Sequence, residues 1–168
     1  MRFMIVLVVL LGVLGSIAGS QAVKKRIVPN GIDAVLRDGK TPEEARKGKG
    51  SPAVLLYDGR FTDSSLVQNP LYVAVDTSSF VPLIIEGTPE AQKDGRGHTL
   101  LGVALKREYA GALENFTRAH LGGRIAIVLG GEVITMHGIR SIITGGKFQI
   151  TRCYDNACEA IQSKLLEM

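Results

Sequence analysis

The sequence predicts an α+β domain, in which helices cover one face of a largely antiparallel sheet. Short β-branched runs that meet at glycine pairs predict strands joined by tight turns, and the pairs are Gly130-Gly131 and Gly145-Gly146. Two stretches with apolar residues at helical spacing predict one helix before the first pair and another after the second. From His98 onward the predicted order is strand, helix, hairpin, strand or loop, strand and helix.

The elements of the middle region are short. Apolar runs at residues 54–57, 71–76 and 81–86 predict three strands, because they are bounded by turn-forming residues. A Thr-Pro-Glu sequence at residues 88–90 predicts a brief turn that ends at residues 94–97.

The C-terminal elements have the clearest boundaries, because glycines separate them. We expect a strand at residues 98–105, a hairpin of strands 124–129 and 132–136, and strands at 139–144 and 147–151. The first helix should bury a face made of Leu105, Tyr109, Ala112, Leu113, Phe116 and His120. The last helix should begin at Asp155 and bury Ala157, Ile161 and Leu165.

The N-terminus has the order of a secretory signal. Arg2 precedes an apolar run from Phe3 to Leu14, and small residues close at Ser20-Gln21-Ala22. The apolar run is shorter than the roughly 20 residues that span a bilayer. We therefore expect a signal peptide at residues 1–22 and an exported, periplasmic or extracellular protein. The alternative is an uncleaved anchor, in which residues 3–20 hold the protein in the cytoplasmic membrane.

Residues 23–52 contain turn signals and one short helix start. Thr41-Pro42-Glu43-Glu44 supplies an N-cap, a proline at the first helical position and an acid at the third. Glycines and a proline at residues 48–52 prevent a longer helix. We expect a mobile N-terminal arm at residues 23–52, followed by the α+β domain at residues 53–168.

The charge of the chain does not favour nucleic acid as a partner. The net charge is +4 and the isoelectric point is about 9.2, but Lys and Arg are scattered among acidic residues. The one basic cluster, residues 24–26, lies beside the leader. A mildly basic exported protein is more simply explained by an anionic membrane surface nearby.

Cys153 and Cys158 are the two cysteines of the chain. In an oxidising compartment such a pair is expected to form a disulfide. A zinc site would need two further ligands, and the three histidines are far apart in the sequence, at positions 98, 120 and 137. We expect no metal.

Two patterns invite an enzymatic or nucleotide-binding interpretation, and both fail. Residues 144–147 read Thr-Gly-Gly-Lys, but Ser141 and Phe148 stand where a P-loop needs a glycine and a Ser or Thr. His137 has no nucleophile elbow in the sequence to act with. We therefore expect a non-enzymatic protein with no cofactor and no bound nucleotide; a secreted hydrolase is the alternative from another class.

Two separated motifs resemble the head subdomain of the first large extracytoplasmic domain of SecD and SecDF. They are RIAIVLGGEVI at residues 124–134 and ITGGKFQIT at residues 143–151, and they are followed by a helix that contains Glu159-Ala160. The resemblance extends over about residues 100–165. It departs from the family at Gly130-Gly131, where an Asp-Gly turn is usual, and at Met136-His137, where a small residue and proline are usual. SecD itself also has transmembrane helices. The resemblance covers the head alone, so it implies a stand-alone head without the transmembrane part.

The resemblance implies a link to protein export, with a polypeptide client or a Sec-type membrane complex as the partner. The glycine turns and the apolar segment between them would bind an extended polypeptide by main-chain hydrogen bonds, aided by a flexible methionine. The expected contact residues are Gly130, Gly131, Met136, Ile139, Arg140, Gly145 and Gly146. Two alternatives stay open: the apolar residues are sheet core, and the protein is a structural or assembly component of the cell envelope that reuses the fold.

Overall fold

The computed structural model describes residues 28–48, 50–59, 61, 71–153 and 157–168. The expected signal peptide at residues 1–22 and the expected helix cap at Asp155 lie outside these residues. Within them, no helix combines the length and the apolar character needed to cross a bilayer.

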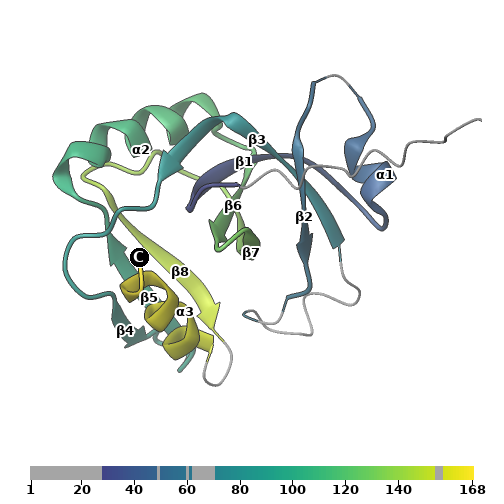
Figure 1. Cartoon of the computed structure of the whole chain (residues 1–168). Helices are drawn as coiled ribbons and strands as arrows, with labels where there is room; N and C mark the ends of the chain where they lie inside the picture. The colour runs from purple at the N-terminus through teal and green to yellow at the C-terminus, as the bar shows by residue number, and fades with distance from the viewer. Residues whose placement is uncertain (1–27, 49, 60, 62–70, 154–156) are drawn as a thin grey trace, which may run out of the picture.

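The described residues form two antiparallel sheets and three helices, so the α+β class is confirmed (Figure 1). The five-stranded sheet has the order β2-β3-β1-β6-β7, and the three-stranded sheet has the order β4-β5-β8. The strands are β1 (Gly31–Gly39), β2 (Ala53–Tyr57), β3 (Leu71–Pro82), β4 (Glu90–Lys93), β5 (Thr99–Ala104), β6 (Arg124–Leu129), β7 (Glu132–Gly138) and β8 (Lys147–Cys153). The helices are α1 (Pro42–Arg46), α2 (Arg107–Ala119) and α3 (Ala157–Leu166).

β1 corrects the expectation of a mobile arm. It lies in the middle of the five-stranded sheet, where it pairs with β3 on one side and β6 on the other. Ile32 and Ala34 are 1% and 3% exposed. The sequence pattern did not predict this strand, because a charged residue, Asp33, interrupts its apolar run. The short helix α1 follows as predicted, and Thr41 Oγ1 accepts a hydrogen bond from the Glu44 amide at 3.2 Å.

β3 replaces two expected strands, at residues 71–76 and 81–86, by a single strand. The polar residues 77–79 form an irregularity within it, because Asp33 pairs with Phe80 while the next residue, Ala34, pairs with Asp76. The Asp76 carboxylate accepts hydrogen bonds from the Ser78 amide and hydroxyl at 2.9 and 2.6 Å. These local bonds stabilise a bulge rather than a turn between two strands.

β4 and the segment before β8 also differ from expectation. Residues 90–93 form an edge strand paired with β5, although all four side chains are exposed; the turn at residues 94–97 is confirmed. Residues 139–144 form a loop instead of a strand, and β8 pairs with β5 rather than with its predicted neighbour. The loop is held elsewhere, because Ile139 exchanges backbone hydrogen bonds with Gly122 and Gly123, both at 2.9 Å. The expected hairpin at residues 124–136 is confirmed.

Two apolar clusters lie on opposite faces of the five-stranded sheet. The first core fills the space between this sheet, the three-stranded sheet and the helices α2 and α3. The helices contribute most of the expected residues, among them Leu113 and Phe116 from α2 and Ile161 and Leu165 from α3. Ala112, expected on the buried face of α2, is exposed. The second core lies on the other face, where the sheet curls so that its edge strands β2 and β7 approach each other. Its members are Val28, Ala53, Leu55, Tyr57, Val73, Val75, Ala126, Val128 and Val133.

Candidate functional site

A cleft of about 1280 Å³ opens between the three-stranded sheet and the β6–β7 hairpin. One wall is the three-stranded sheet: Leu100, Gly102 and Ala104 line the cleft, and so does Val103, which also belongs to the first core. The core side of this sheet packs against α3.

β4 gives this wall its polar character. Glu90, Gln92 and Asp94 line the cleft, while the residues between them, Ala91 and Lys93, do not. The alternation follows from the strand geometry, since successive side chains point to opposite faces of a sheet. An exposed edge strand without apolar residues thus places a row of polar groups along the cleft.

The opposite wall comes from β6, β7 and the loop at residues 139–146. Ile125, Ile127 and the half-buried Ile143 provide apolar surface, and Arg140 and Ser141 form the rim. Met136 also borders the cleft, but its side chain packs against the second core on the other face of the sheet. This wall therefore combines an apolar floor with a charged margin.

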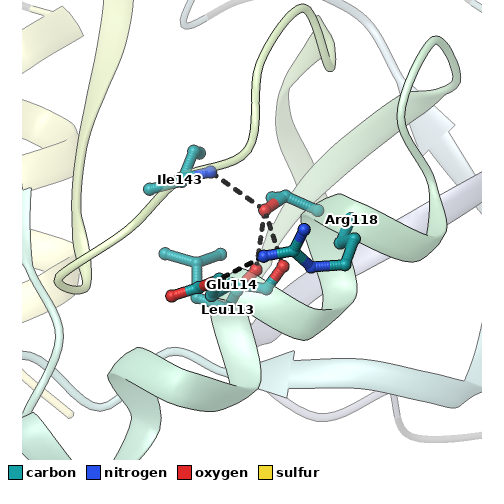
Figure 2. A network of polar contacts seen from close by, with 5 residues as sticks. Leu113, Glu114, Arg118 and Ile143 are labelled. Atoms are coloured by element: carbon teal, nitrogen blue, oxygen red, sulfur yellow. Dashed lines mark hydrogen bonds and ion pairs between the residues drawn. The ribbon is translucent and has the colours of Figure 1, made fainter.

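Thr117 fastens the loop that carries this rim. Its side chain is fully buried, and its hydroxyl contacts the Leu113 and Glu114 carbonyl oxygens at 2.9 and 3.1 Å. The same hydroxyl oxygen accepts a hydrogen bond from the Ile143 amide at 3.0 Å (Figure 2). Beside it, Arg118 and Glu114 form an ion pair at 2.8 Å on the helix surface. The loop is thus tied to α2, which holds the cleft rim in place.

Charges of both signs line the cleft. Glu86, Glu90 and Asp94 lie on the side of β4, and Arg140 and Lys147 lie elsewhere on the rim. Asp94 is held in a fixed orientation, because its carboxylate accepts hydrogen bonds from the Arg96 and His98 amides at 2.8 and 2.9 Å. Hydrogen bonding to the His98 side chain, together with these amides, lowers the pKa of Asp94. The carboxylate is therefore ionised at neutral pH.

His137 lies in the cleft but in a setting that favours its neutral form. Burial lowers the pKa of this histidine. Its Nε2 lies 3.0 Å from the Thr135 hydroxyl oxygen, and Thr135 is 1% exposed. Within the described residues, no group of three or more His, Cys, Asp or Glu side chains is placed to hold a metal ion.

The structure brings together three of the seven expected contact residues. Met136, Ile139 and Arg140 line the cleft. The other four, Gly130, Gly131, Gly145 and Gly146, occupy turns in the left-handed region and are not among the cleft-lining residues. The backbone groups of two of them form hydrogen bonds. The Gly130 amide donates to the Asn30 side-chain oxygen at 2.7 Å, and the Gly146 carbonyl accepts from the Leu105 amide at 2.9 Å.

The sequence reasoning missed the wall formed by β4 and β5. The sequence predicts a turn at Glu90, whereas the residue lies in a strand. It predicts an apolar strand around Gly102 and no role for the glycine. The available signal was a polar residue at every second position, namely Glu90, Gln92 and Asp94. This pattern indicates one face of a sheet only if the segment is known to be a strand.

The comparison with protein families matches residues 84–161 to the SecDF P1 head subdomain. No curated protein matches the chain. Among solved structures, SecDF described as a membrane component that enhances protein export is 23% identical, with a TM-score of 0.47. SecDF in a super-membrane-facing form is 24% identical, with a TM-score of 0.49. SecDF from Thermus thermophilus, described as a translocon-associated membrane protein, is 18% identical, with a TM-score of 0.42.

These matches cover most of this chain and a smaller part of the SecDF chains. They include 80%, 80% and 83% of this chain, against 58%, 18% and 30% of the three SecDF chains. The family match includes the cleft wall of β4 and β5, both glycine turns and the start of α3. Residues 84–161 of this chain are therefore similar to the SecDF P1 head subdomain family.

Proposed function

We propose that this protein is an exported, non-enzymatic module that binds an extended polypeptide segment in the cleft between its two sheets. It acts outside the cytoplasmic membrane beside a Sec-type complex. The match of residues 84–161 to the SecDF P1 head subdomain supports the link to protein export. The observation that carries the binding proposal is the cleft itself, with its apolar floor and charged margins.

The size and the lining of the cleft suit a chain segment better than a small molecule. Its volume of about 1280 Å³ exceeds the roughly 300–1,000 Å³ of common small-molecule pockets. Ile143 is half-buried at the cleft, and apolar contact of this kind does not depend on one particular partner side chain. Such a surface accepts varied sequences, as a binder of exported polypeptides requires.

Strand edges supply the main-chain partners that an extended segment needs. β7 is an edge of the five-stranded sheet, and β8 is an edge of the three-stranded sheet. Both contribute residues to the cleft, among them Gly138 and Gln149. A polypeptide added at such an edge gains affinity from backbone hydrogen bonds, which do not depend on its sequence.

The proposal assigns no catalysis, cofactor, nucleotide or nucleic acid to the protein. The Thr-Gly-Gly-Lys stretch forms a turn that leads into β8, and Gly146 packs against Ala110 of α2. His137, with its lowered pKa, contacts a buried threonine rather than a nucleophile in the cleft.

We also propose that Cys153 and Cys158 form a disulfide after export and cleavage of the leader at residue 22. β8 ends at Cys153, and Cys158 lies in the first turn of α3, where it is 3% exposed. No cysteine of the described chain is free. The bridge would join the three-stranded sheet to the helix that covers its core side.

Suppression of client aggregation tests the binding function. The full chain should reduce the light scattering of reduced, denatured α-lactalbumin. Ile143→Gln, which places an amide at the apolar floor, should weaken the effect. Leu36→Gln changes a side chain that is 49% exposed on β1 and does not line the cleft, so it is the matched control.

Two outcomes would contradict this function. No suppression by the unchanged protein would favour a structural or assembly component of the envelope. Equal losses for the Ile143 and Leu36 variants would contradict binding in the cleft, even if the protein binds unfolded chains.

A further inference from the structure

Gly102 lies in the middle of β5, which is the central strand of the three-stranded sheet. It pairs with Glu90 of β4 on one side and Gln149 of β8 on the other, and the register is regular on both sides of it. Its side of the sheet is the cleft wall. Glycine weakens the interior of a strand, so its presence here needs a reason.

The fold itself does not require a glycine at this position. The φ of Gly102 is outside the left-handed region, where glycine is favoured. A Cβ added here would meet one neighbour within 4 Å, the Glu90 carbonyl oxygen at 3.5 Å, which is an ordinary van der Waals distance. Neither backbone conformation nor crowding excludes a larger residue. A strand glycine with these properties is typical of a place where another backbone approaches closely.

The residues around Gly102 form a shallow trough along β5. Gly102 and Ala104 are its floor, and longer side chains stand on the two neighbouring strands. Neighbouring strands lie about 4.8 Å apart, so the side chains of β4 and β8 flank a space of about 10 Å. One extended chain fits between them. The flanking residues are Glu90, Gln92, Lys147 and Gln149.

The groups beside Gly102 indicate which chain would bind. The exposed Glu90 carboxylate is its direct cross-strand neighbour, and Glu86 and Asp94 line the same side of the cleft. Gln149, on the other side, carries an amide that can both donate to and accept from a peptide backbone. Lys147 is two residues further along, opposite Ala104. The position at Gly102 therefore complements a positive charge.

We propose that Gly102 is the point of closest approach for the backbone of a bound extended polypeptide, and that Glu90 selects a Lys or Arg of that polypeptide beside it. The inference rests on the proposed function and specifies its ligand: an extended segment with basic residues. Binding by an acidic segment is the opposite outcome.

The first test fills the trough with Gly102→Val. Valine is a good strand residue, so the free energy of unfolding in urea should be unchanged or higher. The probes are three fluorescein-labelled twelve-residue peptides of valine, alanine and serine, which carry lysine, glutamine or glutamate at the same three positions. Fluorescence anisotropy should show that the variant binds the lysine peptide about tenfold more weakly, a change of one order in Kd. Gly111→Val, at an exposed position of α2 with open space around it, is the matched control.

The second test removes the charge with Glu90→Gln. An exposed ion pair contributes little, so affinity for the lysine peptide should fall about two- to fivefold and approach that of the glutamine peptide. Affinity for the glutamine peptide should not change. Glu167→Gln removes an exposed carboxylate near the C-terminus and should leave all three affinities unaltered.

The outcomes separate this inference from the proposed function. Tight binding of the lysine peptide by a folded Gly102→Val protein would overturn the backbone contact. Equal binding of the lysine and glutamate peptides, or an unchanged preference in Glu90→Gln, would overturn the charge selection. In either case a loss of aggregation suppression in Ile143→Gln would still support polypeptide binding in the cleft. If the unchanged protein binds none of the three peptides, both the proposed function and this inference are contradicted.

Discussion

The two sheets differ in how they are covered. The five-stranded sheet is buried on both faces: along β6, Ile127 and Leu129 belong to the first core, while Ala126 and Val128 belong to the second. The three-stranded sheet has one face in the first core and the other open to the cleft, where Gly102 and Glu90 lie. Stability should therefore reside mainly in the larger sheet, and ligand contacts in the smaller one.

The difference also appears in the residues each sheet tolerates. β1 and β6 carry apolar residues on both faces, as strands covered on two sides require. β4 has no buried residue, and β5 carries a glycine at its centre. A sheet that presents a binding surface can accept residues that weaken a strand, because its partner sheet supplies the core.

The largest expected effect tests the larger sheet. Ile32→Ala in β1 removes a side chain that is 1% exposed in the first core. It should lower the free energy of unfolding in urea by about 2–5 kcal/mol, from lost apolar burial and the cavity that remains. Leu36→Ala, on the same strand but 49% exposed, should change it by less than about 0.5 kcal/mol. Similar small losses of unfolding free energy for both variants would contradict a central position of β1 and would indicate a peripheral segment.

The second prediction concerns the buried carboxylate of the larger sheet. Asp33 is 0% exposed, and neither side-chain oxygen has a hydrogen-bond partner among the described residues. Burial, and the nearby Asp76, raise the pKa of Asp33 from 3.8 to about 7. Between these values the native state keeps a proton that the unfolded chain has released. The free energy of unfolding contributed by Asp33 therefore falls as the pH rises from about 4 to about 7.

Asp33→Asn isolates this effect. The lowered pKa of His137 acts in the opposite direction, since its contribution is lost as the pH falls below 6.5; the variant retains that histidine. The free energy of unfolding of the variant minus that of the unchanged protein should rise by a few kcal/mol between pH 5 and pH 8. Urea unfolding at both pH values measures it. A difference that stays constant with pH would mean that Asp33 does not titrate in this window.

The third prediction concerns the smaller sheet. If Cys153 and Cys158 are bridged, reduction should lower the free energy of unfolding by about 2 kcal/mol, as the chain-entropy model gives for a closed loop of about six residues. Urea unfolding with and without dithiothreitol measures it. The double variant Cys153→Ser/Cys158→Ser should not respond to the reductant. A thiol titration that finds two free groups in the exported protein would exclude the bridge.

The smallest expected effect is local to α1, beside the larger sheet. Thr41→Ala removes the side-chain cap of this helix, whose Oγ1 accepts from the Glu44 amide. The expected loss is about 1 kcal/mol or less. Thr41→Ser keeps the cap and should be close to unchanged. A loss as large as that of Ile32→Ala would show that the packing of α1, rather than its cap, matters.

Local signals in the sequence predicted most elements of the second half of the fold, although the strand expected at residues 139–144 is a loop. The glycine pair at Gly130-Gly131 marks the β6–β7 hairpin, and apolar stripes mark α2 and α3. These features depend on neighbouring residues alone. β1 and β4 were missed because their strand character depends on partners: Asp33 breaks the pattern of the first, and the second has no apolar pattern at all.

The candidate site was predicted in part for the same reason. Met136, Ile139 and Arg140 stood out as a dense apolar and basic segment next to a hairpin, and they line the cleft. Glu90 and Gly102 face them from elements that are distant in the sequence, so only the fold reveals that they share one surface.

Backbone amide chemical shifts during titration with the lysine peptide test the central claim most directly. If the cleft binds the segment, the amides of Gly102, Gly138 and Arg140 should shift together and saturate at one Kd, while those of Gly48 and Gly59 should not move. Shifts confined to Gly48 and Gly59, or spread evenly over the chain, would contradict a binding site between the two sheets.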